Sequence, residues 1–404
     1  MLLHSTEDII ITILLMMITI FLVSSVKELY TNISKISNKN IEEHMVNISK
    51  PTRTATWGND NQCGYKMSQT FTDIMKKNNI NQSKKDDWLI YYPCSYNNID
   101  QEIKNINPTN KDQRIFIIDN ADQLSSKSNL WGNLIKKYGR EEALKMAPPT
   151  YRLNYNLDMN LFKKEYDPDK IYIMKKNIQR QEGLKITNNK DEIINGKDLG
   201  YVVVQELLQD PYIINDRKTN MRFYILLVCQ NNELAAYVHK NGFMYYTRMP
   251  FQKKTITDGP NITTGYIERW IYKVNPLSHD DFRNYLDAPD RKLNDAEQQL
   301  VNNNQQLSKV VFDRIYDLIK KMIVAIEHNV CTESHLKDYI TFQLFGIDIA
   351  TNDKLESVVI ECNKGPSIEC FDGDDCKVKQ AVAGDIFKVL KVVDDKDNGF
   401  MQIL

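Results

Sequence analysis

The sequence predicts a mixed α+β fold, and two kinds of segment lead to this prediction. Short apolar segments that end at turn-forming residues indicate strands, and they cover residues 171–176, 201–208, 221–230 and 234–239. Residues 310–329 carry apolar side chains three and four positions apart, which is typical of an amphipathic helix. We therefore expect strands joined by turns, together with at least one long helix.

Length and composition describe an ordinary globular protein. The chain has 404 residues, enough for two or three domains, with 26% charged and 42% hydrophobic residues. A net charge of −1 predicts no nucleic-acid partner. Seven cysteines without a Cys-x-x-Cys spacing predict reduced thiols, and neither a zinc site nor a disulfide framework.

The N-terminus predicts a membrane anchor. Residues 9–26 are almost entirely apolar and would form a helix of about 27 Å, near the lower limit for crossing a bilayer. Acidic residues precede this segment and lysines follow it, so the positive-inside rule predicts a single-pass protein with the bulk of the chain in the cytosol. A cleaved signal peptide and a buried helix are the alternatives. We expect an anchor at 1–30 and a polar linker at 31–56.

The next segment, 57–150, shows a mixed pattern that predicts a small N-terminal α/β domain. Residues 88–92 and 114–119 resemble strands, and 130–145 has helical periodicity. The proline pair at 148–149 ends this pattern.

A hairpin near the C-terminus carries three oxygen ligands for a cation. Two apolar segments, within 342–367, flank a polar turn at 351–356, and this spacing places Asp348 opposite Glu361. Glu361 and Asn363 are two residues apart, so a strand points both to one face. Two carboxylates and an amide suit Mg²⁺, whereas a surface hairpin with scattered acids is the alternative.

Two further strands carry features that suit a nucleotide. Lys175 precedes a polar loop that ends at Gly183, an arrangement that suits phosphate oxygens, although a surface lysine would look the same. The strand 201–208 could offer backbone groups to an adenine, or it could be an ordinary core strand.

The strand that starts near residue 218 has an unusual polar face. Side chains two residues apart point to the same side, which groups Lys218, Asn220, Arg222 and Tyr224. Such a face suits anionic ligands, and an arginine can hold a carboxylate or phosphate with two hydrogen bonds. A solvated edge strand is the alternative.

Taken in this order, the segments resemble the tubulin–tyrosine ligase family, which has the ATP-grasp fold. The resemblance runs from about residue 131 to residue 387. Its most specific parts are the hairpin, similar to "F-G-x-D" and "E-V-N-x-x-P-S", and residues 218–222, similar to "K-F-D-L-R". Residues 172–175 resemble "W-I-V-K", and 205–208 resemble "Q-K-Y-I".

The resemblance implies a role for each of these residues. It divides the fold into a central ATP-grasp domain at 151–230 and a C-terminal one at 231–404. It implies Mg²⁺ at Asp348, Glu361 and Asn363, and catalysis by Arg222 and Lys218. It implies that ATP is bound by Lys175, Arg180, Gly183, Gln205, Glu206, Leu207, Leu208, Lys218 and Asn220.

The implied reaction is ATP-dependent ligation. A free amino acid, tyrosine or glutamate, would be joined through an acyl phosphate to a glutamate carboxylate of a protein such as tubulin. The family's "R-G-x-G" is Arg180-Gln181-Glu182-Gly183 here, and its "K-F-D-L-R" aspartate is Asn220. These departures support an alternative, a catalytically weak ATP-binding protein that acts as a membrane-tethered interaction module. An ATP-grasp ligase of small peptides is a second alternative.

Overall fold

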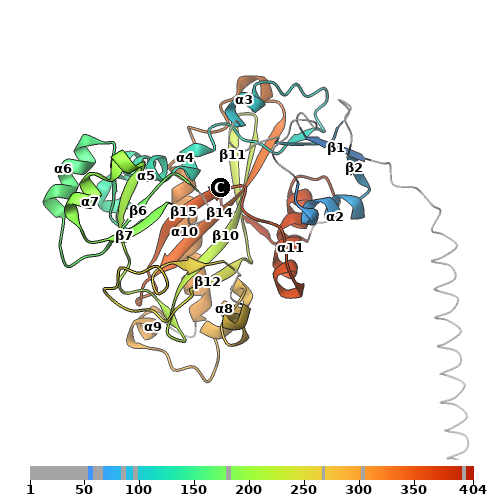
Figure 1. Cartoon of the computed structure of the whole chain (residues 1–404). Coiled ribbons are helices and arrows are strands. Elements are labelled where there is room, and N and C mark those ends of the chain that lie inside the picture. The colour runs from blue at the N-terminus through green and yellow to red at the C-terminus, as the bar shows by residue number, and fades with distance from the viewer. Residues whose placement is uncertain are drawn as a thin grey trace, which may run out of the picture. The chain divides into compact units, whose positions relative to one another are not determined.

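The computed structural model describes residues 53–57, 67–82, 88–93, 99–178, 183–265, 269–301, 305–393 and 397–404. Contacts divide the chain into two units, 1–52 and 53–404, and every described residue lies in the second. This unit combines a large sheet, a small sheet and flanking helices, which confirms the predicted α+β class (Figure 1). The subdivision of 53–404 at residues 150 and 230 remains a prediction.

The large sheet is organised around two long strands, β10 (Arg217–Gln230) and β14 (Ile340–Thr351), which pair antiparallel. Its order is β13-β12-β10-β14-β4-β3-β1-β2; β15 also pairs with β14, β9 and β11 pair with β10, and β16 pairs with β11. The remaining strands are β1 (Arg53–Trp57), β2 (Ile80–Gln82), β3 (Ile90–Tyr92), β4 (Arg114–Ile115), β9 (Ile213–Ile214), β11 (Glu233–His239), β12 (Phe243–Thr247), β13 (Thr263–Thr264), β15 (Ser357–Lys364) and β16 (Phe400–Gln402). The N-terminal strands β1 to β4 are parallel and join the sheet where β4 pairs with β14.

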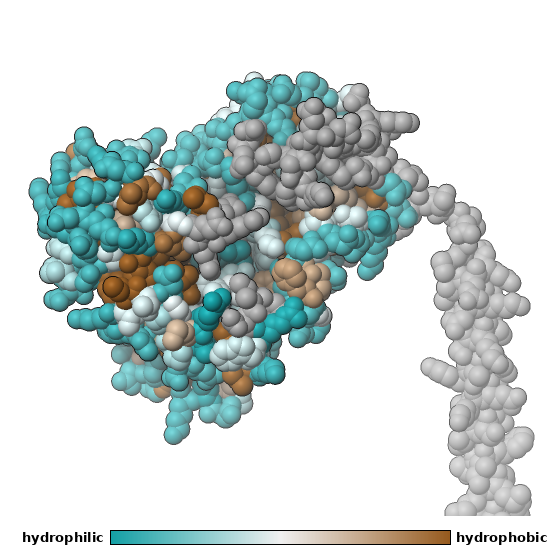
Figure 2. All heavy atoms as spheres, viewed as in Figure 1, coloured by the Kyte–Doolittle hydropathy of each residue, from teal (hydrophilic) through white to brown (hydrophobic). Residues whose placement is uncertain are grey.

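The small sheet is antiparallel, in the order β5-β8-β6-β7. Its strands are β5 (Thr150–Arg152), β6 (Tyr172–Lys175), β7 (Leu184–Thr187) and β8 (Val203–Glu206). One face packs against α6 (Asn156–Glu165) and α7 (Lys190–Ile194), which precedes the short helix η1 (Gly196–Leu199). The other face carries a separate apolar cluster of Ile171, Ile173, Ile186 and Leu207. Apolar side chains gather over this part of the molecule in Figure 2.

Helices cover both faces of the large sheet because β10 alternates apolar side chains between them. Phe223 and Ile225 pack with α10 (Leu307–Val324), whereas Tyr224 and Leu226 pack with α2 (Gln69–Lys77) and α11 (Gly373–Val389). The other helices are α3 (Ile99–Ile103), α4 (Asp122–Ser125), α5 (Lys127–Ala143), α8 (His279–Leu286), α9 (Asp295–Leu300), η2 (Arg269–Lys273) and η3 (Ser334–Leu336). In Figure 1 the small sheet and α2 with α11 lie on opposite sides of the long strands.

The predicted localisation requires a correction. In the part of the chain that the structure describes, no helix is both long enough and apolar enough to cross a membrane. The segment expected to do so, residues 9–26, lies outside the described residues. At about 27 Å its helix would only approach the roughly 30 Å of a hydrocarbon core, so hydropathy alone was a weak basis for an anchor. We withdraw the single-pass assignment.

The prediction of reduced thiols is also wrong for four cysteines. Disulfides join Cys229 to Cys331 and Cys370 to Cys376, whereas Cys362 is free and buried. The fold brings the paired Cα atoms to 5.4 Å and 4.8 Å, within the range for a disulfide. Cys229 and Cys331 are 102 residues apart, and no sequence pattern shows that the fold brings them together. The first pair was missed for this reason.

Candidate active site

The predicted hairpin forms from β14 and β15, and Asp348 pairs with Glu361 as its spacing indicated. The register shifts after Asp348, so Ile349 pairs with Val359 and Ile360 is the extra residue of a bulge. Asn352 holds the turn because its side-chain oxygen accepts hydrogen bonds from two backbone N–H groups of the turn. The bulge separates a regular apolar end of the hairpin from the end that carries the carboxylates.

Asp348 forms a bidentate ion pair with Arg222 of β10. The Arg222 Nε donates to Oδ1 at 2.5 Å and Nη2 donates to Oδ2 at 2.9 Å. Burial raises the pKa of Asp348, and Glu361 adds to this, although Arg222 opposes it. Burial alone would lower the pKa of Arg222, but Asp348, Tyr245 and Tyr224 together outweigh burial and raise that pKa. The pair therefore keeps two charges inside the protein.

Glu361 is held in its ionised form by nearby cations. Burial alone would raise its pKa, but Lys127 and Lys175 together lower it. The Lys127 Nζ lies 3.5 Å from Oε2, and the Asn363 amide donates to Oε1 at 3.1 Å. Two carboxylates, an amide and three cations thus meet around this end of the hairpin.

Two buried lysines face this cluster. The Lys175 Nζ donates to the Gln205 Oε1 at 2.7 Å, and the Gln205 amide donates to the Thr150 hydroxyl at 2.8 Å. Burial lowers the pKa of Lys175 to about 8. Burial and the charge of Lys175 also lower the pKa of Lys218 to about 8. Both side chains would be stabilised as cations by an anionic ligand.

The segment predicted to contact an adenine lies at the end of β8. The Glu206 N–H donates to the Pro149 carbonyl and the Leu207 N–H to the Ile171 carbonyl, each at 2.8 Å. The Leu208 N–H makes no hydrogen bond with any residue that the structure describes. This free donor lies next to the apolar cluster on the open face of the small sheet, which includes Leu207.

Asn220 has a polar atom that no protein group satisfies. Its side-chain nitrogen donates to the Thr263 hydroxyl at 2.9 Å. Its Oδ1 is buried and has no partner among the described residues. A buried acceptor without a donor costs free energy, so this oxygen suits a ligand or a bound cation.

The structure also identifies a residue that the sequence did not single out, Lys127 at the start of α5. The Ser126 side chain caps this helix by accepting from the Asn129 N–H. A serine before an apolar helical pattern indicates where the helix begins, but not that its first side chain reaches Glu361. Lys127, Lys175, Gln205 and Glu361 line one pocket.

The predicted phosphate loop is described at one end. Gly183 has a φ of +72°, and a Cβ there would lie 2.8 Å from the Cβ of Lys176. Glycine is therefore required at this position. Arg180 lies outside the described residues.

The family follows from a comparison of sequences. A sequence model of the Tubulin-tyrosine ligase family matches residues 92–399, more than half of the chain. The chain belongs to this family. The resemblance inferred from the motifs is thereby confirmed.

Several members of the family are similar to this chain along part of their length. Tubulin polyglutamylase ttll-5 of Caenorhabditis elegans is 26% identical over 55% of this chain and 30% of the relative. Tubulin polyglutamylase TTLL5 of Mus musculus is 24% identical over 67% of this chain and 20% of the relative. A probable beta-tubulin polyglutamylase of Tetrahymena thermophila is 26% identical over 66% and 23%. The chain thus spans less than a third of the length of these relatives.

Proposed function

We propose that this chain is an ATP-dependent ligase that joins an amino acid to a side-chain carboxylate of a protein. The observation that carries the proposal is the opposed pair of Asp348 and Glu361, which interacts with Arg222, Lys127 and Lys175, while Lys218 lies close enough to Lys175 to affect its charge. Membership of the family supports it. The names of the relatives favour glutamate as the added amino acid and tubulin as the acceptor.

In this proposal the two sheets form an ATP-grasp fold, with the nucleotide between the small sheet and the β14–β15 hairpin. The free Leu208 N–H and the Glu206 carbonyl would pair with the adenine edge, against Ile173 and Ile186. Lys175 and Lys218 would neutralise the phosphates, with Arg180 and Gly183 in the covering loop. The placement of two cations with lowered pKa values beside the hairpin supports this orientation.

The donor set on the hairpin fits Mg²⁺. Asp348, Glu361 and Asn363 offer two carboxylates and an amide, and magnesium usually takes few protein ligands beside phosphate oxygens. Each Asp348 oxygen already accepts a hydrogen bond from Arg222, so it would coordinate the metal through a remaining lone pair. Magnesium held there would offset the negative charge of the phosphates.

The chemistry would follow in two steps. A carboxylate oxygen of the acceptor attacks the γ-phosphorus of ATP, the bond to ADP breaks, and an acyl phosphate forms. The amine of the free amino acid then attacks the acyl carbon, loses a proton, and releases inorganic phosphate. Lys218 and Arg222 would steady the negative charge that develops in both steps.

The test uses the full chain with Mg²⁺, ATP, labelled glutamate or tyrosine, and tubulin. We expect label in tubulin and release of ADP. Glu361→Gln should abolish both, whereas Glu356→Gln, on the exposed turn of the same hairpin, should retain them. Full activity of Glu361→Gln would overturn the metal assignment, and absence of label with the unaltered chain would overturn the ligase.

The altered motif Arg180-Gln181-Glu182-Gly183 supports a second candidate function, an ATP-binding protein without turnover, because an acid within a phosphate-binding motif would repel phosphates. Titration calorimetry distinguishes the two functions. Binding of ATP without release of ADP in the presence of tubulin and glutamate would favour the second.

A further inference from the structure

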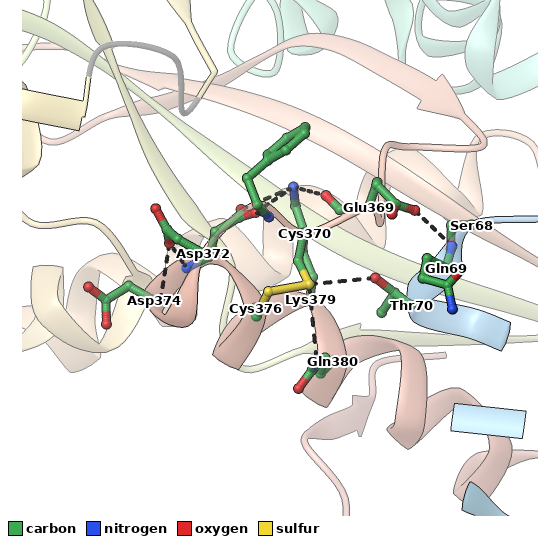
Figure 3. The surroundings of a disulfide bond; sticks show 12 residues. Ser68, Gln69, Thr70, Glu369, Cys370, Asp372, Asp374, Cys376, Lys379 and Gln380 are labelled. Carbon is green, nitrogen blue, oxygen red and sulfur yellow. Dashed lines mark hydrogen bonds and ion pairs between the residues drawn. A yellow bond between two sulfur atoms is a disulfide. The ribbon is translucent and has the colours of Figure 1, made fainter. Parts of the chain in front are cut away.

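A short loop before α11 is closed by the disulfide between Cys370 and Cys376 (Figure 3). It follows the metal-binding strand β15 and runs into the first turn of the helix. The Asp372 side chain caps the helix by accepting from two backbone N–H groups of its first turn. We call residues 370–376 the clamped loop.

The clamped loop presents a large apolar side chain to solvent. Phe371 is 63% exposed, yet its backbone is fixed because its N–H donates at 2.8 Å to Asp375, which is completely buried. The Lys379 Nζ pairs with Asp375 at 3.0 Å and donates to the Glu369 carbonyl at 2.5 Å. It also lies 5.1 Å from the Phe371 ring. Aromatic residues, Phe among them, are enriched at the centres of protein–protein interfaces, so a fixed and exposed ring is available for such a contact.

A series of stacked groups connects Phe371 to the candidate active site. Lys379 lies 5.8 Å from the Phe243 ring, and this ring is parallel to that of Tyr245, with centroids 6.4 Å apart. The Arg222 guanidinium lies 5.3 Å from the Tyr245 centroid. Lys379, Phe243 and Tyr245 thus form a continuous row of groups between Phe371 and Arg222.

Three more contacts hold the clamped loop and the residues before it. Asp372 pairs with Arg269 at 3.2 Å, and Arg269 lies a few residues beyond β13, whose Thr263 binds Asn220. Glu369 accepts from the Gln69 N–H of α2 at 2.9 Å, and the Thr70 hydroxyl approaches the Cys370 sulfur (Figure 3). Contacts from η2, α2 and α11 thus keep this segment in one conformation.

We infer that the clamped loop recognises the protein acceptor, with Phe371 packing on the acceptor chain beside the carboxylate that reacts. This inference rests on the proposed ligase function. The expected nucleotide residues are Lys175 on β6 and Leu208, two residues beyond β8, and Figure 1 shows this small sheet on the opposite side of the long strands from α11. A free amino acid is small and charged, whereas an exposed aromatic ring at the rim suits a macromolecule. Closure by the disulfide lowers the entropy that the loop loses on binding.

The first experiment measures the affinity of the full chain for purified tubulin, and then the KM for tubulin. Phe371→Ala should lower the affinity for tubulin about tenfold and raise the KM by a similar factor. This is the loss expected for one well-packed aromatic contact. Phe371→Leu should recover most of this. Leu157→Ala, on α6, removes a side chain that is 84% exposed far along the chain, and should change neither. The affinity for ATP is the reference in every variant.

The outcomes separate this inference from the ligase proposal. Weaker tubulin binding by Phe371→Ala supports the inference even if no variant turns over. Equal binding by Phe371→Ala and the unaltered chain overturns it, and so does a lack of tubulin binding by both. Loss of ATP affinity together with tubulin affinity would also overturn it, because Phe371 would then act on the fold.

A second experiment tests the clamp itself. Dithiothreitol transfers two electrons and two protons to the disulfide, giving two thiols and its own cyclic disulfide. Mild treatment should open Cys370–Cys376, which is half-buried, and leave the buried Cys229–Cys331 intact, as mass spectrometry of alkylated cysteines would show. Tubulin affinity should fall about threefold, as for Cys370→Ser with Cys376→Ser, because preorganisation is lost. Unchanged or tighter binding would overturn the role of the clamp.

Discussion

The ion pair between Arg222 and Asp348 shows how burial makes single residues indispensable. Both side chains are largely enclosed, with 14% and 12% of their surface exposed. A charge in such a place is stable only with its partner, because water no longer solvates it. In the proposed reaction the same pair would also contact the metal and the reacting groups, so stability and chemistry would depend on the same two side chains.

Removal of one partner should therefore destabilise the fold. Arg222→Ala leaves the Asp348 carboxylate buried without a cation, and we expect the free energy of unfolding to fall by about 3–5 kcal/mol. Urea denaturation measures this. Lys309→Ala breaks an exposed pair with Asp313 and should have little effect. Equal losses in the two variants would contradict the role given to burial.

The lowered pKa values predict a dependence of ATP binding on pH. Lys175 and Lys218 titrate near 8, so both lose their charge as the pH rises from 7 to 9. The phosphates favour the charged forms, so ATP affinity should fall over this range. Lys175→Arg stays charged and should weaken the dependence. Calorimetry at pH 7, 8 and 9 tests this, and a constant affinity would contradict it.

The same lysines affect stability with the opposite sign. Their folded pKa values of about 8 lie below the ordinary value of 10.5, so the unfolded chain binds more protons between these limits. Their contribution to the free energy of unfolding without ATP should therefore rise with pH between about 8 and 10.5. Comparison with Lys175→Met, which cannot titrate, isolates the contribution of Lys175. If the free energy of unfolding changed with pH equally in Lys175→Met and in the unaltered chain, the prediction would be contradicted.

At the scale of elements, the β6–β7 connection depends on one glycine. Gly183→Ala should destabilise the protein by about 1–2 kcal/mol, since its φ of +72° is strained for alanine and the Cβ would touch Lys176. Gly384→Ala is the control, because Gly384 lies in α11 with nothing within 4 Å of an added Cβ. That change should stabilise by about 0.5–1 kcal/mol. The prediction fails if the two substitutions act alike in thermal denaturation.

Elements with a strong local pattern were predictable, and others were not. The β14–β15 hairpin and α10 follow from alternation and from helical periodicity. The polar region after Tyr245 gave no such pattern, so β13, α8 and α9 were missed. Both helices begin with a capping box, Ser278 with Asp281 in α8 and Asn294 with Glu297 in α9. These residue pairs indicate a helix start and could have been recognised in the sequence.

At the scale of the whole molecule, the proposed nucleotide would connect the two sheets. They already approach each other where the Lys175 Nζ of β6 lies 3.5 Å from the Ile360 carbonyl of β15. ATP at a hundred times its Kd should raise the free energy of unfolding by about 2.7 kcal/mol. Thermal denaturation with and without Mg²⁺ and ATP measures this. Lys175→Met should lose the effect, and an unaltered midpoint for the unaltered chain would contradict the site.

The sequence by itself determined which side chains share a strand face and which residues oppose each other in the hairpin, because both depend on local periodicity. Asp348 faces Glu361 for this reason. Tertiary structure decided the pairing of Arg222 with Asp348, 126 residues away, the contact of Lys127 with Glu361, and the joining of Cys229 to Cys331. Such contacts depend on how all the sheets and helices pack together, and no local sequence pattern predicts that packing.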